Sequence, residues 1–294
     1  MENTTTHKDA NSFALSLKEK IKVIEKIENI PAMPIVVSNI ISKLNDPNAT
    51  NKELEELISL DPVLVSFILK IVNSPFYGTR SEVLTISKAL FIMGIKNLKI
   101  LMMGYGAQTV FQTMENKKIQ DYLWKHSISV GVLSKLLSEH FFKVVHSEAY
   151  VSGLLHDIGK IVLFSHDKKR FIQSLISEKG KMKNFVDSEQ ELFGFSHIET
   201  GYFLISKLGF SGTIKDIILY HHYPEYASEN DSLVWIVGLA DEMSYYLEDQ
   251  IDDETLFDNI DLYMKKLGLN EDQIGQVIAD SVDEIEAYLA LMKL

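Results

Sequence analysis

The spacing of apolar residues restricts this chain to helical folds. In almost every segment between glycines and prolines, apolar side chains recur three and four residues apart, as they do in the segment 36–44. This period gives a helix one buried face, whereas a strand on a sheet surface needs strict alternation, and no stretch of the chain alternates convincingly. The sequence therefore predicts an all-α protein with no significant sheet.

Local signals for the ends of helices support this prediction. Thr50 and Glu53 have the form of a capping box, and Asp61 followed by Pro62 offers an N-cap with proline at the first helical position. Gly94 is expected to end a helix that starts near Thr85. These signals predict short, separately capped helices in the first third of the chain.

A run of charged residues between Glu115 and Asp121 marks the boundary between two helical lobes. Four parts are expected in all. They are a flexible tail at 1–16, an N-terminal helical lobe at 17–118, a second helical lobe at 119–250, and C-terminal helices at 251–294 that pack on the second lobe.

Composition excludes several classes of function. The chain has 29 Lys and Arg against 41 Asp and Glu, a net charge of −12, so it lacks the basic surface that a nucleic acid partner needs. It has no cysteine, so a metal could be held only by nitrogen and oxygen ligands. The longest uncharged stretch, 100–114, is too short to cross a membrane, and the polar N-terminus has no signal region. We expect a soluble, cytoplasmic protein with no membrane partner.

Histidines and aspartates gather in the C-terminal half of the chain. The candidate metal ligands are His126, His156, Asp157, His197, His221, His222 and Asp241. Imidazole and carboxylate suit iron, manganese, zinc or nickel, and seven such groups exceed the needs of one ion. One or two divalent metal ions are therefore expected, and Asp157 is the natural bridge between two.

A structural role is the alternative for each of these residues, since a lone histidine on a helix is usually solvated or hydrogen-bonded. We give that interpretation to His7, His140, His146 and His166, and His126 taken alone would favour it too. The adjacent pair His156 and Asp157 differs, because it ends an apolar run, where a buried carboxylate would be costly without a cation. A metal or an ion pair is expected there.

The order of these residues resembles a known pattern. His126, the string LLHDIGK at 154–160, and Asp241 in GLAD at 238–241 resemble the H…HD…D motif of the HD metal-dependent phosphohydrolase superfamily. The string FSHIETG at 195–201 and the pair His221-His222 resemble the additional histidines of the HD-GYP branch. The resemblance implies a first ion on His126, His156, Asp157 and Asp241, and a second on Asp157, His197, His221 and His222.

A second set of motifs lies in the N-terminal half. The strings are IPAMP at 30–34, DP at 61–62, LKIVNSPFYG at 69–78 and MG at 93–94. With the motifs of the C-terminal half they resemble the HDOD domain, a relative of the HD hydrolases. The resemblance implies an HD-like bundle in the C-terminal lobe and a role in bacterial signal transduction, through a signalling protein partner or a nucleotide second messenger.

Two functions follow from these resemblances. One is a regulatory module that keeps a metal site, and the other is a phosphohydrolase acting on a nucleotide or cyclic dinucleotide, with Asp157 and Lys160 as its catalytic residues. HD-GYP phosphodiesterases place a glutamate and a Gly-Tyr-Pro segment after the paired histidines, whereas this chain has YPEY at 223–226. We therefore expect little hydrolysis of cyclic di-GMP. The loop 73–78 is expected either to bind a partner through Phe76 and Tyr77 or to bury both rings between the lobes.

Overall fold

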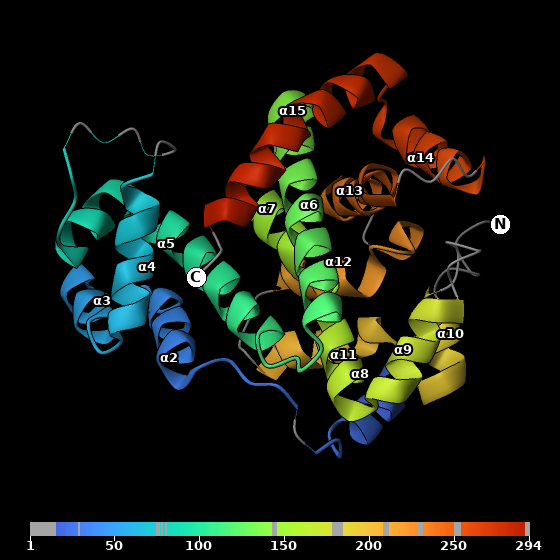
Figure 1. Ribbon diagram of the computed structural model, residues 1–294, viewed down its shortest axis with the longest axis horizontal. Coiled ribbons are helices and arrows are strands. Elements are labelled where there is room, and N and C mark those ends of the chain that lie inside the picture. Colours follow the sequence, from blue (N-terminus) through green and yellow to red (C-terminus); the bar gives the residue numbers. More distant parts are fainter. Residues whose placement is uncertain are drawn as a thin grey trace. The chain divides into compact units, whose positions relative to one another are not determined.

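The computed structural model describes most of the chain (Figure 1). The described residues are 16–28, 30–74, 77, 79, 81–142, 146–177, 185–207, 212–227, 232–249 and 254–291. Within these ranges all regular structure is helical and no residue is in a strand, which confirms the predicted fold class. No helix in them combines the length and the apolar character that crossing a membrane requires.

The helices follow one another with short connections. In chain order they begin with α2 Ile35–Leu44, α3 Asn51–Ile58, α4 Pro62–Val72, α5 Ile86–Phe111, α6 Lys117–Phe141, α7 His146–Leu155, α8 Gly159–His166, α9 Lys168–Ser177, α10 Phe185–Phe193 and α11 His197–Lys207. The remainder are α12 Gly212–Tyr220, the short 3-10 helix η2 Pro224–Tyr226, α13 Ser232–Asp249, α14 Glu254–Leu267 and α15 Glu271–Leu291.

Contacts divide the described chain into two units. The large unit contains the residues up to Pro31 and Thr113–Val282, and the small unit contains Ala32–Gln112 and the described residues from Asp283 onward. The helical segment 16–24 therefore groups with the large unit, whereas residues 17–24 are part of the predicted N-terminal lobe. In this segment Lys20 Nζ lies 2.7 Å from Glu199 Oε1, which belongs to α11 of the large unit.

In the small unit, α2 packs on α3 and α5, and α4 packs on α5. The caps of α3 and α4 are those predicted, since Thr50 and Glu53 form both hydrogen bonds of a capping box and Asp61 accepts from the N–H groups of Val63 and Leu64. Gly94 has a φ of 74° inside α5 and interrupts its helical geometry. A residue without Cβ adopts this left-handed conformation readily, which explains the helix stop predicted there.

The motif at 69–78 is anchored by one side chain. Asn73 donates from Nδ2 to the carbonyls of Leu69 and Val83, and its Oδ1 accepts from the N–H of Val83. The asparagine thus joins the end of α4 to the segment ahead of α5. Pro75, Phe76 and Gly78 lie outside the described residues, and so the predicted interaction loop stays a prediction.

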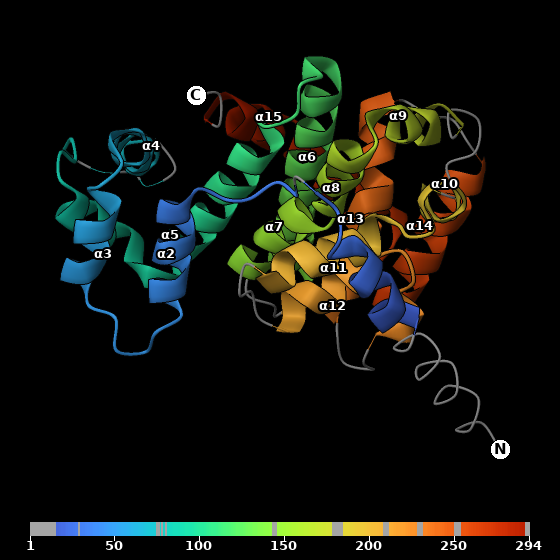
Figure 2. The ribbon, with the colours of Figure 1, turned by 90° about the horizontal axis from the view of Figure 1, so that it is seen from below.

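The large unit is built around α6, α7 and α13, which lie side by side in both views (Figures 1 and 2). Helix α11 packs on α8 and α12, α12 also contacts α7 and α13, and α14 packs on α13. Their contacts bury a continuous apolar core. Several histidines and aspartates are also buried in this unit.

Candidate metal centre

All seven predicted ligands lie together inside the large unit. His126 is on α6, the pair His156-Asp157 forms the turn between α7 and α8, and His197 is the first residue of α11. His221 and His222 directly follow α12, and Asp241 is on α13. Every one of these side chains is buried except that of His222, which is 20% exposed. Side chains from five separate elements thus meet in one cluster.

Asp157 is at the middle of the cluster. Its Oδ2 lies 3.4 Å from Nε2 of both His126 and His156. Its other oxygen, Oδ1, lies 3.3 Å from His197 Nε2 and 3.9 Å from His221 Nε2. Each carboxylate oxygen therefore faces a different pair of imidazoles.

Asp241 is the second carboxylate of the cluster and contacts three of its histidines. Its Oδ1 lies 3.1 Å from His126 Nε2 and 3.5 Å from His156 Nε2, while its Oδ2 lies 3.9 Å from His222 Nδ1. The rings of His197 and His222 meet with their Nε2 atoms 3.1 Å apart. The two aspartates thus contact all five histidines between them.

The outward-facing nitrogens of the histidines have fixed partners. Nδ1 of His156 donates to the Gly153 carbonyl at 2.7 Å, and Nδ1 of His221 to the carbonyls of Ile217 and Ile218, both at 3.1 Å. A carbonyl oxygen can only accept, so the proton of each neutral ring is on Nδ1. The lone pair on Nε2 then faces the aspartates, which is the arrangement typical of metal-binding histidines.

Two side chains orient the rings of His197 and His126. Glu189 Oε2 accepts from His197 Nδ1 at 2.6 Å and from the His197 N–H at 2.8 Å. The Ser244 hydroxyl donates to the Asp241 carbonyl and lies 3.0 Å from His126 Nδ1, from which it accepts. Neither residue was predicted, because no motif or regular spacing links them to the histidines they hold.

The atoms at the centre fit a divalent cation. Within the described structure, Nε2 of His156 and His221 and Oδ1 of Asp157 and Asp241 have no hydrogen-bond partner, although all are buried. Buried lone pairs that face one another are costly unless a cation lies between them. Ligand atoms converge within 4.8 Å in three overlapping groups. They are His126, His156 and Asp157; Asp157, His197, His221 and His222; and His156, His221 and Asp241.

The charges of the cluster follow from its burial. Burial disfavours a charged ring at His156, but Asp157 and Asp241 outweigh that effect and raise its pKa to about 9. Burial and the neighbouring His197 lower the pKa of His222 to about 3. Burial also opposes charge on Asp157, yet Lys160 and the imidazoles hold the pKa of that carboxyl well below its usual range. Without metal, a proton on His156 supplies part of the missing positive charge.

Lys160 is the cation that the protein itself provides. It is buried in the first turn of α8, where its Nζ donates to Asp157 Oδ2 and lies 4.7 Å from the centroid of the Phe185 ring. Burial opposes the charge of the ammonium, but Asp157 and other carboxylates raise the pKa of Lys160 above its ordinary value. Lys160 therefore stays charged beside the cluster at all ordinary pH values.

Two glycines let the supporting elements approach closely. A Cβ on Gly153 would lie 2.6 Å from the Val130 carbonyl oxygen, so α7 packs directly on the α6 backbone. A Cβ on Gly159 would lie 1.9 Å from the His197 carbonyl oxygen. These approaches bring His126 and His197 up to the pair His156-Asp157, and side chains at either glycine would separate them.

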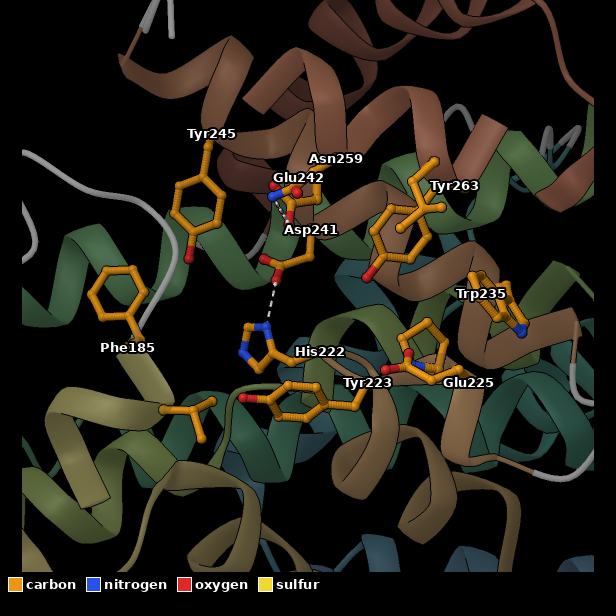
Figure 3. A pocket seen from close by; sticks show the side chains of 13 residues that line it. Phe185, His222, Tyr223, Glu225, Trp235, Asp241, Glu242, Tyr245, Asn259 and Tyr263 are labelled. Atoms are coloured by element: carbon orange, nitrogen blue, oxygen red, sulfur yellow. Dashed lines mark hydrogen bonds and ion pairs between the residues drawn. The ribbon is translucent and has the colours of Figure 1, made fainter. Parts of the chain in front are cut away.

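A cavity of about 310 Å³ opens beside the cluster (Figure 3). His222 and Asp241 form part of its wall, and in Figure 3 the aromatic side chains of Phe185, Tyr223, Tyr245 and Tyr263 surround them. The remaining lining residues are Val186, Pro224, Glu225, Trp235, Glu242, Asn259 and Leu262. The cluster thus has a neighbouring space in which a ligand could lie.

Comparison with known proteins identifies relatives of this fold. Residues 30–224 match the family model of the HDOD domain. The solved structure of an HDOD domain protein from Geobacter sulfurreducens has a TM-score of 0.74 and 26% identity, over 96% of this chain and all of that one. A structure from Shewanella amazonensis SB2B, provisionally named a phosphohydrolase, has a TM-score of 0.70 and 21% identity, over 91% of this chain and 93% of that one. At that identity the likeness shows the fold alone.

A relative is also found among curated sequences. An uncharacterized protein of Treponema pallidum (strain Nichols) is 26% identical over 242 residues, which are 81% of this chain and 46% of that protein. The chain thus spans about half the length of the curated relative that it matches.

Proposed function

The chain belongs to the HDOD domain family, and we propose that it is a signalling module whose buried cluster holds one or two divalent metal ions. The observation that carries this proposal is the orientation of the histidines. Nδ1 of His156 and of His221 is held by backbone carbonyls, and that of His197 by a carboxylate, while Nε2 of each ring faces Asp157. A cluster that served packing alone would not need its lone pairs to converge.

The two ligand sets meet at one carboxylate. We assign His126, His156, Asp157 and Asp241 to a first ion, and Asp157, His197, His221 and His222 to a second. The second set is one of the groups whose atoms converge, and the first adds Asp241, through its contacts with His126 and His156, to the group of His126, His156 and Asp157. Nitrogen and oxygen ligands of this kind suit iron, manganese, zinc or nickel. Bound divalent ions would act as Lewis acids toward an oxygen of a phosphate ligand.

The module is proposed to act by binding, through a signalling protein partner or a nucleotide second messenger. The segment after His222, where the HD-GYP phosphodiesterases have their Gly-Tyr-Pro segment, is here η2 with Tyr223 and Glu225 on the cavity wall. Glu225 brings negative charge to that wall, which disfavours a second phosphate there. A ligand can thus reach the cluster without being held in line for reaction, and misplacement by about 1 Å can cost on the order of a hundredfold in rate.

A phosphohydrolase is the second candidate, and Lys160 favours it. This ammonium group is buried against Asp157, where it could offset charge that develops on a phosphate oxygen. In that case Asp157 and Lys160 are the catalytic residues, acting on a nucleotide or cyclic dinucleotide.

Metal content tests the proposal directly. The full chain, purified without chelator, should carry one or two divalent ions by elemental analysis. Asp157→Ala should lose most of this metal and unfold at lower temperature, because the change removes the shared ligand and leaves the imidazoles facing one another.

Asp121→Ala is the matched control, since it removes an exposed carboxylate from the helix that carries His126. It should leave the metal content unchanged. Equal metal content in both variants, or none in the unaltered chain, would contradict the proposal.

Turnover of cyclic di-GMP by the same preparation decides between the two candidates. We expect hydrolysis to be very slow or absent. Rates ordinary for an enzyme, about 1 per second or more, that disappear in Asp157→Ala would establish the phosphohydrolase.

A further inference from the structure

We infer that the cavity beside the cluster is a binding site for a small organic cation, such as a quaternary ammonium compound. The cavity has a volume of about 310 Å³, enough for a small molecule, and its wall combines aromatic rings with carboxylates. This site is distinct from the proposed metal ligands, because most of its lining residues do not belong to the cluster.

The charge of the wall determines the sign of the ligand. Glu225, Asp241 and Glu242 line the cavity, whereas no Lys or Arg is among the described residues that line it. The carboxylates of Glu225 and Glu242, which are outside the proposed ligand sets, therefore favour a cation in the part of the cavity that they line.

The aromatic side chains supply the second half of the recognition. Trp235 and Tyr263 meet edge to face, with their centroids 5.8 Å apart, and form a corner of the wall. Tyr245 lies across from them in Figure 3, with Asp241 and His222 between, and Tyr223 lies below His222. Electron-rich ring faces next to carboxylates are the usual setting for alkylammonium groups, which are too bulky and too weakly hydrated to pair with a carboxylate alone.

The protein's own ammonium groups already use these rings. Lys266 Nζ lies 5.2 Å from the centroid of Trp235, and Lys160 Nζ lies 4.7 Å from that of Phe185. Two rings of the wall therefore attract cations in the structure as it stands. The cavity between them has the same chemistry and the space for a ligand.

Glu225 and Glu242 are outside the proposed ligand sets, so the cation site does not depend on the proposed function. Titrations with choline, carried out on the full chain with metal and after chelation, would test it. Trp235 reports binding by its fluorescence once Trp124→Phe has removed the other tryptophan. Choline should bind with saturation, and dimethylbutanol, its neutral isostere, should bind at least tenfold more weakly.

Matched variants locate the site. Glu225→Gln should weaken choline binding about fivefold, the effect of a partly exposed charge pair, and Tyr223→Leu should weaken it by a similar factor through the lost ring face. Glu191→Gln and Tyr226→Leu change equivalent exposed side chains that are not among the lining residues, and neither should alter binding.

Three results would overturn the inference. The first is equal binding of choline and dimethylbutanol, and the second is equal binding of choline by the Glu225 and Glu191 variants. The third is tighter binding of guanosine than of choline, which would make the cavity a nucleobase pocket. Because the titrations include chelated protein, they test the cation site even if the protein proves not to bind metal.

Discussion

At the scale of single residues, the second proposed ion depends on a side chain that is not one of its ligands. Glu189 is fully buried and accepts both the Nδ1–H and the backbone N–H of His197 through one oxygen. A carboxylate in this position sets the direction of the ring and makes its Nε2 a stronger ligand. Glu189 is thus a positioning residue for the part of the cluster formed by His197, His221 and His222.

Glu189→Gln should lower the affinity of the second ion about 10- to 100-fold, the usual effect of losing such a partner, and leave the first ion in place. Competition with a metal-sensitive dye would measure the two affinities separately. Glu191→Gln removes the same charge from the surface of the same helix and should change neither. A parallel loss of both ions in Glu189→Gln would mean that the residue supports the whole cluster and has no selective role.

At the scale of elements, the cluster exists because helices approach one another more closely than ordinary side chains permit. The turn between α7 and α8 carries His156 and Asp157, and Gly159 sets it directly against the first turn of α11. Thr200 adds a hydrogen bond from its hydroxyl to the Gly159 carbonyl at 3.1 Å. The position of His197 is therefore tied to that of Asp157 through backbone contact.

Gly159→Ala should destabilise the protein by about 2–4 kcal/mol, because the new methyl group overlaps backbone atoms and α8 and α11 must separate. Metal affinity should fall as well. Urea denaturation of the metal-free protein, followed by a metal titration, would measure both effects.

Gly275 provides the opposite case for comparison. It is an exposed residue of α15, and a Cβ there would meet nothing within 4 Å. Gly275→Ala should stabilise the protein by up to about 1 kcal/mol, since alanine is the better helix former. Similar effects of the two substitutions would argue against a special role for the contact at Gly159.

At the scale of the whole molecule, pH should separate the metal-free protein from the metal-loaded one. The pKa of His156 is raised to about 9 in the folded metal-free protein. A raised pKa contributes stability that is fully present below the unfolded value, about 6.5, and is lost as the pH rises through the folded value. The metal-loaded protein has an ion where that proton would be and should lack this loss.

The increase in melting temperature caused by metal should therefore grow between about pH 6.5 and about pH 9. Scanning calorimetry of chelated and loaded protein across this interval would measure it. A constant difference would show that His156 does not exchange its proton for a metal ion.

The sequence alone determined the class of the fold and the membership of the cluster. Apolar spacing of three and four residues permits helices and excludes sheets, and cap residues such as Thr50 and Asp61 act through hydrogen bonds to their own neighbours. The seven candidate ligands were found because their residue types and motif order are visible without a structure.

Only the tertiary structure decided how the cluster is held and what surrounds it. Glu189, Ser244 and the cavity wall come from segments far apart in the chain, and no local rule links a buried carboxylate to the ring it will orient. The helical segment 16–24 is a second example of a position that local sequence does not determine. Its spacing predicts one buried face, but the spacing does not show that the segment joins the large unit, where Lys20 contacts Glu199, 179 residues away. Contacts between distant segments are a property of packing, which a local pattern of residues does not contain.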